Sequence, residues 1–359
     1  MKKMKKIWKL NFLIMTVCAV LISSCKQPGT KQSTELEGDW EGCVVGMYTE
    51  AENGYFPPDG EKAIIGFEEL IDHEAGSVVW FPTWDDPFPT KACEEARKQG
   101  AIPHITWELF WPSVNPHHTR EIDSTGYEAM DEVLTGKHDA YIDSFATDAK
   151  NYGGIVLNRF LHEFNGNWYV WSGNKNGKEN GGPEKVVAVW KYVVDRFKAI
   201  GADNVKWLWV PHGPSVDLST EAWNDVANYW PGDEYVDWIG LDGYNFYPTD
   251  PWGGARPYRD FDNCFRKLYD DCAKLGNQPM MIAEFGTGEF TYEDKTKADW
   301  IKDAFTKIKN EYPRIKIFTW FHINKECDWR VNSSQEALAA FREAMKDPYY
   351  IGSPYQKSE

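Results

Sequence analysis

Eight short apolar segments recur along this chain, and amphipathic segments separate them. Apolar runs without alternation are typical of parallel strands covered on both faces, and such strands need long crossover connections. The expected strands are 43–48, 77–84, 102–107, 155–163, 205–212, 236–245, 279–286 and 316–323. The expected helices are 61–72, 90–99, 137–152, 183–200, 218–229, 258–275, 294–311 and 334–345. The alternation predicts parallel βαβ units.

The closed form of this pattern is the (β/α)8, or TIM, barrel, which suits a chain of 359 residues. A doubly wound open sheet is the alternative, although no GxGxxG motif follows the first strand. No linker or internal repeat divides residues 40–350. We therefore expect a single α/β barrel domain over 39–359.

The N-terminal segment has the pattern of a bacterial export signal. Five lysines precede the apolar run "FLIMTVCAVLI", which is too short to span a bilayer comfortably, and "ISSC" ends at Cys25. We expect a lipoprotein signal peptide over 1–24, lipidation of Cys25 and a polar tether over 25–38; an ordinary signal peptide is the alternative. The expected location is the bacterial cell envelope, on the outer membrane surface or the periplasmic face, held only by the N-terminal lipid.

Charge and cysteine content exclude several classes of protein. Without residues 1–24 the chain keeps 34 basic and 55 acidic residues, a formal charge of −21. An acidic chain of this kind lacks the basic surface of a nucleic-acid-binding protein. The five cysteines after Cys25 include no CxxC pair, so the fold is no disulfide scaffold. The acidic balance suits a neutral ligand, and we expect a monomer.

A barrel places functional residues at the C-terminal ends of its strands. Polar and aromatic residues recur at those positions here. They are Trp84, His104, Trp107, Glu108, His162, Glu163, His212, Asp242, Tyr244, Asn245, Glu284, Trp320 and His322.

Glu163 and Glu284 end the fourth and seventh expected strands, so a closed barrel would point both into one cleft. Two facing carboxylates are what glycoside hydrolysis requires, one protonated and one ionised, with no cofactor. Each could instead form a salt bridge with a strand-end arginine. A zinc site is not supported, because HExxH would need a second histidine where Gly166 stands. No GxSxG motif supports a serine hydrolase.

Four blocks resemble glycoside hydrolase family 26, a family of retaining (β/α)8 glycosidases that includes β-mannanases and mixed-linkage β-glucanases. "RFLHEFNGNWYVW" resembles its HExNGxW motif, and "YWPGDEYVDWIGLDGYN" (229–245) resembles its sixth-strand block. "MIAEFGTGE" (281–289) resembles the nucleophile block, and "FTWFHINKECDWRVNSS" (318–334) the eighth-strand block. The resemblance covers roughly 43–346.

The resemblance implies roles for the two carboxylates and their neighbours. Glu163 matches the general acid/base, and Glu284 matches the nucleophile of a double displacement. His162 matches a sugar-binding residue beside the acid/base, although it could be a satisfied structural histidine. Trp168 matches an aromatic surface just beyond the cleavage point.

Two further residues match members of the family's site. Tyr244 matches a tyrosine that hydrogen-bonds the nucleophile, and Trp320 matches the surface under the sugar that is attacked. Either could instead be barrel packing. Asp242 is expected to orient its neighbours rather than react.

For other aromatic and charged residues near the strand ends, the sequence allows two roles. Trp84, Trp111, Trp171 and Trp252 could line distal subsites or anchor loops. Asp328 and Arg330 are expected to form an ion pair or to hold the eighth loop over the cleft.

The third-strand block leaves the substrate open. "PHITWELFWP" (103–112) is more similar to the branch with mixed-linkage β-glucanases and β-1,3-xylanases than to the "WHW" block of many mannanases, and Phe164 stands where many mannanases have Met. His104, Trp107 and Glu108 are therefore expected to contact substrate. The resemblance implies a retaining endo-β-glycanase acting on a plant β-glycan, with β-1,4-mannan first. Mixed-linkage β-1,3-1,4-glucan and β-1,3-xylan are the alternatives, and a glycan-binding protein without catalysis is a remote one.

Overall fold

The computed structural model describes residues 36–49, 60–111, 129–214, 218–250 and 254–354. The chain divides into two units, 1–33 and 34–359, and every described residue belongs to the second. The expected signal peptide and Cys25 lie outside the described residues. Leu36 is buried, and its carbonyl accepts a 2.8 Å hydrogen bond from the Trp238 indole. The compact unit thus begins before the expected boundary at residue 39.

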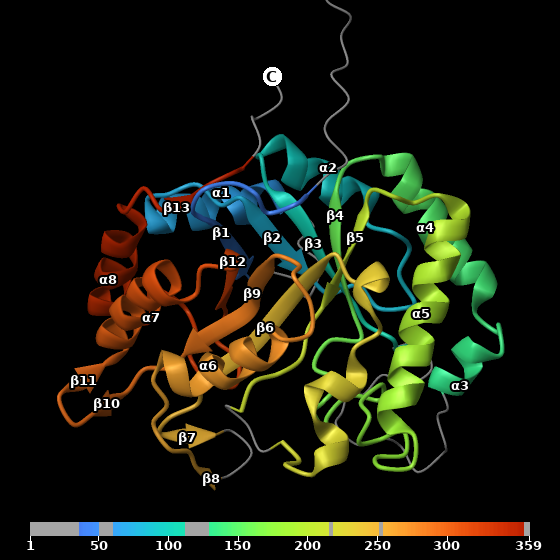
Figure 1. The fold of residues 1–359 in the computed structure, drawn as a ribbon. Helices are drawn as coiled ribbons and strands as arrows, with labels where there is room; N and C mark the ends of the chain where they lie inside the picture. Colours follow the sequence, from blue (N-terminus) through green and yellow to red (C-terminus); the bar gives the residue numbers. More distant parts are fainter. Residues whose placement is uncertain (1–35, 50–59, 112–128, 215–217, 251–253, 355–359) are drawn as a thin grey trace, which may run out of the picture. The chain divides into compact units, whose positions relative to one another are not determined.

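All eight expected strands form, and they pair in parallel in one closed sheet (Figure 1). They are β1 (Cys43–Thr49), β2 (Ser77–Trp80), β3 (Ile102–Trp107), β4 (Val156–Phe160), β5 (Val205–Trp209), β6 (Trp238–Asn245), β9 (Met280–Thr287) and β12 (Ile315–His322). Neighbours in the sheet follow chain order, and β12 pairs back onto β1 from Val44↔Ile317 to Thr49↔His322. This closure confirms the (β/α)8 barrel and excludes the open sheet. A short strand, β13 (Tyr350–Ile351), pairs with the start of β1.

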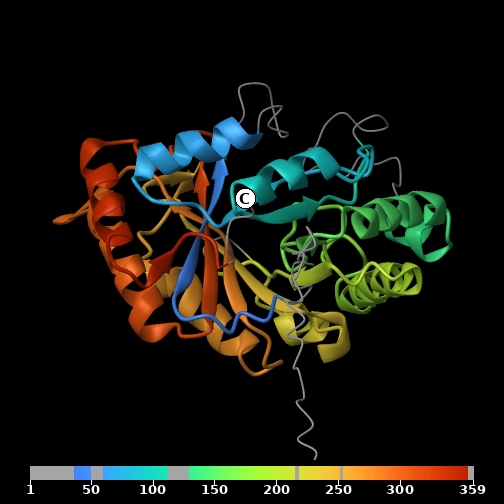
Figure 2. The ribbon, with the colours of Figure 1, turned by 90° about the horizontal axis from the view of Figure 1, so that it is seen from above.

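Helices follow one another in chain order around the strands (Figure 2). They are α1 (Gly60–Ile71), α2 (Thr90–Lys98), α3 (Ala129–Leu134), α4 (Asp139–Tyr152), α5 (Gly182–Ile200), α6 (Phe261–Cys272), α7 (Lys297–Glu311) and α8 (Gln335–Met345). Gly153 and Gly201 end α4 and α5 in the left-handed conformation that glycine allows. Ser334 caps α8 by accepting a hydrogen bond from the backbone N–H of Ala337.

The helix expected over 218–229 is wrong. Two 3-10 turns, η1 (Ala222–Asn224) and η2 (Val226–Tyr229), occupy this stretch, and a third, η3 (Asp233–Tyr235), precedes β6. Asp225 separates the first two because its backbone is extended and its side chain accepts from the N–H of Ala227. A side chain that bonds to nearby backbone competes with helix formation.

Two short hairpins extend loops at the C-terminal ends of the strands (Figure 1). One joins β7 (Thr249–Asp250) to β8 (Gly254–Ala255) after β6. The other joins β10 (Thr291–Tyr292) to β11 (Lys295–Thr296) after β9. Both lie on the side of the barrel where the site is expected.

Alternating side chains of the strands fill the barrel and the layer around it. A cluster drawn from seven barrel strands can form only if its members point inward; it includes Val44, Ile102, Leu157, Leu208, Trp238, Met281 and Ile317. A larger cluster joins the outward-facing side chains to the helices. A third, aromatic cluster gathers at the C-terminal end and includes Tyr48, Phe81, Tyr244 and Phe321. Burial of this much apolar surface, at ~25 cal/mol per Å2, holds the strand ends in fixed positions.

Two further properties bear on the expectations from sequence. Cys43, Cys93, Cys264, Cys272 and Cys327 are free thiols. Within the part of the chain that the structure describes, no helix has both the length and the apolar character needed to cross a membrane.

Candidate active site

The turn after β4 carries Glu163. The strand ends at Phe160, three residues before the expected end, and both Leu161 and Glu163 have a positive φ, of 49° and 53°. Such backbone conformations are uncommon for non-glycine residues and need surrounding support. The Glu163 N–H supplies part of it by donating to the Val210 carbonyl at 2.7 Å. The turn therefore presents the carboxylate at the mouth of the barrel.

Two rings contact the two oxygens of Glu163. The Trp168 indole Nε1 donates to Oε2 at 2.6 Å, and His212 Nε2 lies 3.5 Å from Oε1. Burial raises the pKa of Glu163, His212 opposes that rise, and the nearby charge of Glu284 adds to it. The net rise favours a protonated carboxyl, which is the state a general acid needs.

Glu284 lies on β9, where a register shift against β6 occurs between the pairs Leu241↔Ile282 and Asp242↔Glu284. Arg159 donates to Oε1 of Glu284, and the Tyr244 hydroxyl donates to Oε2 at 2.5 Å. Both oxygens are thus held by donors. Donors on both oxygens fix the direction of the carboxylate.

Arg159 is fully buried and bridges two carboxylates. Its Nη1 donates to Asp242 Oδ2 at 2.8 Å, and its Nε donates to Thr106 Oγ1 at 2.8 Å. Burial opposes the charge of Arg159, but Glu284 and Asp242 outweigh it, so the pKa of Arg159 is raised. Burial raises the pKa of Asp242 well above its usual range, and Arg159 opposes that rise. Asp242 contacts the arginine that holds Glu284, as expected of a residue that orients its neighbours.

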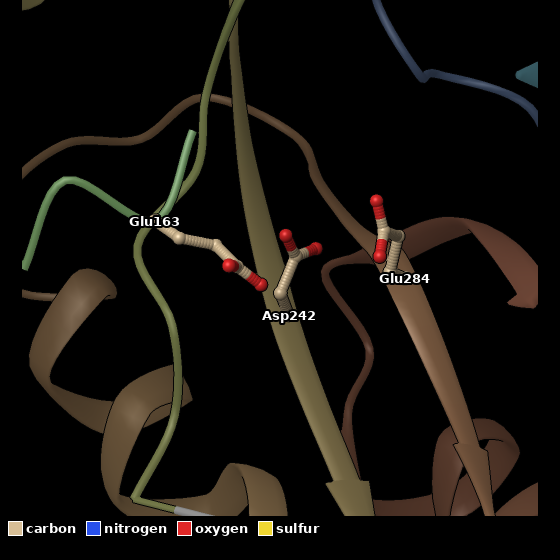
Figure 3. Close-up of side chains that lie close together, drawn as sticks. All are labelled: Glu163, Asp242 and Glu284. Atoms are coloured by element: carbon tan, nitrogen blue, oxygen red, sulfur yellow. The ribbon is translucent and has the colours of Figure 1, made fainter. Parts of the chain in front are cut away.

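Glu163, Asp242 and Glu284 point into one space (Figure 3). One oxygen from each lies within 4.8 Å of the other two. Retaining glycosidases place their carboxyl groups ~5–5.5 Å apart, whereas inverting enzymes leave ~6.5–9.5 Å for a water. Among the described residues these carboxylates are also the group close enough to bind a metal ion together, but the Arg159 guanidinium already contributes positive charge between two of them.

His162 and Trp168 lie beside the carboxylates, as expected. His162 Nε2 is 2.9 Å from the Tyr169 hydroxyl, and the His162 carbonyl accepts from the Trp171 indole at 2.7 Å. Trp168 is half-buried, and its indole edge contacts the His212 ring. Trp168 therefore keeps part of its surface free to contact a ligand.

Glu108 and His104 lie on the same side of the barrel at different depths. Glu108 is buried just beyond β3 and pairs with Thr83 in an isolated bridge. Its charge contributes to the raised pKa of Tyr169, after burial and Glu163, which places it near that hydroxyl. His104 is 0% exposed, and burial lowers its pKa well below the usual range, with Arg159 adding to the effect. His104 is thus a neutral side chain below the mouth, closed to a ligand, and its expected contact with substrate is wrong.

Trp107 and Trp320 do not reach the site, and the expectation that they contact substrate is wrong. Trp107 is 0% exposed and stacks on Phe145 of α4 at 4.3 Å. Trp320 is also 0% exposed, packs against Phe341 of α8, and donates its indole N–H to a backbone carbonyl. Both point outward into the helix layer, so neither can stack on a sugar. The residue after Trp320, Phe321, has the opposite strand parity and lies in the cluster at the mouth.

Two of the four open aromatic positions are buried within the fold. Trp84 and Trp171 are buried, Trp111 is half-buried, and Trp252 lies outside the described residues. Asp328 and Arg330 form the expected ion pair: Nε and Nη2 of the arginine donate to the two carboxylate oxygens at 2.7 and 2.6 Å.

Three residues of the site were not assigned a role from the sequence. They are Arg159, Tyr169 and His212. Arg159 follows Asn158 inside the mostly apolar run 155–161, and this was the available signal, because a charge in a buried strand needs a partner. His212 ends an expected strand, and Tyr169 belongs to an aromatic stretch whose directions are set by the turn after β4. No sequence periodicity applies to such a turn.

The sequence model of glycosyl hydrolase family 26 matches residues 96–344. The chain belongs to this family. Endoglucanase H of Acetivibrio thermocellus is 34% identical over 95% of this chain, which spans 34% of that protein's length. A mannan endo-1,4-β-mannosidase of Bacillus subtilis is 28% identical over 62% of the chain and 57% of its own length. The fold is that of a solved mannanase from Bacillus subtilis, at a TM-score of 0.59 and 18% identity, covering 89% of this chain and 90% of the other.

Proposed function

We propose that this protein is a retaining endo-β-glycanase that hydrolyses β-1,4-mannan. The observation that carries the proposal is the pair Glu163 and Glu284, whose nearest oxygens lie within 4.8 Å at the mouth of the barrel. Glu284 attacks the anomeric carbon while Glu163 protonates the leaving oxygen. Glu163 then takes a proton from water, which releases the sugar from Glu284 with net retention.

The surroundings of the two carboxylates support this division of roles. Burial and the charge of Glu284 raise the pKa of Glu163, which suits an acid. Glu284 receives donors from Arg159 and Tyr244, which suits a nucleophile aimed by its partners. No cofactor enters these steps, because the two carboxyl groups supply both the proton and the nucleophile.

Mannan is proposed as the substrate because several relatives are named mannan endo-1,4-β-mannosidases. A β-glucan is the second candidate, favoured by the 34% identity to Endoglucanase H and by the third-strand block with Glu108. Mannose and glucose differ at O2, so a hydroxyl-binding side chain near that position would discriminate between them. Glu108 and Tyr169 are the candidates for that discrimination.

The substrate experiment compares reducing-sugar release from mannan, barley β-glucan and β-1,3-xylan. Glu163→Gln and Glu284→Ala should abolish release, whereas Glu179→Ala, which changes an exposed carboxylate, should not. NMR of the first product should show the β-anomer. A protein that binds these glycans but cleaves none would instead be the remote alternative, a glycan-binding protein. An α-anomer would contradict the retaining mechanism.

We also propose that Cys25 carries a lipid that holds the protein in the bacterial envelope. The support is the sequence pattern of residues 1–25. Cys25→Ala should move the protein from the membrane fraction to the soluble fraction after cell breakage. Membrane association that persists in the variant would contradict lipidation.

A further inference from the structure

His212 is fixed in place directly after β5. Its backbone N–H donates to Asn165 Oδ1 at 2.9 Å, and its carbonyl accepts from Asn165 Nδ2 at 2.9 Å. The residue also forms a parallel bridge with Asp242, and its side chain is 3% exposed. Asn165 belongs to the same turn as Glu163, so His212 and Glu163 are held in one frame.

One ring nitrogen of His212 contacts the backbone, and the other faces Glu163. Nδ1 lies 2.7 Å from the Gly213 carbonyl, which can only accept, so Nδ1 carries a hydrogen. Nε2 is the nitrogen that gains or loses a proton, and it lies 3.5 Å from Glu163 Oε1. The other oxygen of Glu163 already accepts from Trp168. The Trp168 indole also packs nearly perpendicular to the His212 ring, with centroids 5.4 Å apart.

We propose that His212 and Glu163 share the proton that the acid/base step uses. This rests on the proposed function of Glu163. The proton moves from Glu163 Oε1 to His212 Nε2, which converts a neutral acid and a neutral imidazole into a carboxylate and an imidazolium. The total charge of the pair does not change, so the exchange needs no other reactant.

The two forms suit the two steps of the reaction. With the proton on Glu163, the pair supplies the acid for the leaving oxygen. After that proton has left, Glu163 is the base: it takes a proton from the attacking water and passes it to His212 Nε2, which leaves Glu163 ionised. An imidazolium beside the carboxylate stabilises the base form against the burial that opposes it.

Other charged and titratable groups face this pair from every neighbouring strand. They are Arg159 on β4, Asp242 and Tyr244 on β6, Glu284 on β9, and Tyr169 on the turn after β4. Glu284 raises the pKa of Glu163, whereas His212, Arg159 and the Trp168 N–H lower it. His212 is the largest of the opposing influences, so its removal should change the balance most.

The first test needs no activity. 15N-labelled histidine NMR follows the His212 ring through a pH titration in the wild type and in Glu163→Gln. If the proton is shared, the 15N shift of His212 Nε2 should differ between the two proteins, with less of the protonated ring in Glu163→Gln. Identical Nε2 shifts in the two proteins at every pH would overturn the proposal, whatever the protein hydrolyses.

The second test separates proton sharing from a structural role. His212→Asn keeps a donor near Nδ1 for the Gly213 carbonyl and removes Nε2, and His212→Gln is the companion variant. On an aryl β-glycoside with a good leaving group, release of the sugar from Glu284 limits the rate, so kcat and KM should fall together by ~10-fold or more. On an oligosaccharide, whose leaving group needs the acid, the alkaline limb of kcat/KM should move to higher pH, because a group that lowers the pKa of Glu163 is gone.

His138→Gln provides the matched control, because His138 pairs with Glu132 outside the site. Its kinetics should match the wild type. If His212→Asn lowers kcat/KM equally at every pH and leaves the alkaline limb in place, His212 is only structural and the proposal fails. If the wild type cleaves no β-glycan, the proposed function fails, and the NMR titration still decides whether the proton is shared.

Discussion

Replacing Arg159 by Met tests whether the buried ion network holds the site together. The change keeps an apolar stem of similar length but removes the guanidinium that contacts Asp242, Glu284 and Thr106. Two buried carboxylates then lose their positive partner. Removing one partner of a buried ion pair costs ~3–5 kcal/mol, because the other charge stays buried without compensation. We therefore expect the free energy of unfolding to fall by about that amount.

The loss should depend on pH. Burial raises the pKa of Asp242 and Arg159 opposes that rise, so removing Arg159 raises this pKa further in the folded state alone. Above the ordinary carboxyl range of ~4, the folded variant then binds more protons than its unfolded chain, and its stability falls as the pH rises. The deficit should be smallest in acid and largest near neutrality.

Urea unfolding of both proteins, followed by circular dichroism between acid and neutral pH, measures this deficit. Arg196→Met is the control, because Arg196 forms half-exposed pairs with Asp139 and Asp143, which are worth ~0–1 kcal/mol. Adding Asp242→Asn to Arg159→Met should recover part of the loss. A deficit no larger than that of the control, or one that is constant with pH, would refute the reasoning.

Three further predictions concern single side chains. Tyr244→Phe removes the hydroxyl that donates to Glu284, and loss of a hydrogen bond to a charged group, ~1.5–3 kcal/mol, should lower kcat/KM roughly 10–150-fold while thermal unfolding changes little. Trp320→Ala should cost ~3–5 kcal/mol of stability in urea unfolding and leave KM of the folded enzyme unchanged, because the ring packs against helices; a raised KM would contradict that placement. Lys297→Met strips a buried donor from three acceptors of the loop after β12, at a cost of ~1–3 kcal/mol. Because burial lowers the pKa of Lys297 to about 8, the wild type should gain stability relative to this variant as pH rises above that value, and urea unfolding at two alkaline pH values checks the sign.

The order and type of the barrel strands could be predicted from the sequence, because strands covered on both faces leave a continuous apolar signal. The segment 218–229 shows where this fails. It has apolar residues at suitable spacing, yet Asp225 bonds to its own backbone, and local capping interrupts the helix. The short helix α3 adds no long apolar face and was not predicted.

Some residues of the site could likewise be predicted from the sequence and others could not. Glu163 and Glu284 were identified as a pair from strand ends and motif, and the structure brings them together. Trp320 and Trp107 were misplaced because a strand buried on both faces gives no parity signal: an aromatic residue may face the lumen or the helices. A one-residue difference, as between Trp320 and Phe321, reverses the face. Arg159 was missed because its partners lie 83 and 125 residues away in sequence.

The ion network of the site belongs to one arc of the barrel. Arg159, Asp242 and Glu284 come from β4, β6 and β9, and His212 follows β5, so these are consecutive strands of the closed sheet. The opposite arc, from β12 through β1 to β3, contributes Phe321, Tyr48 and Glu108 to the mouth instead. Loops of that second arc can therefore be changed without altering Arg159, Asp242 or Glu284, provided that Lys297 still holds the loop after β12. For protein engineering the barrel therefore has two parts. The arc from β4 to β9 sets the protonation of the site, and the loops of the opposite arc are the place to select for binding of a new glycan.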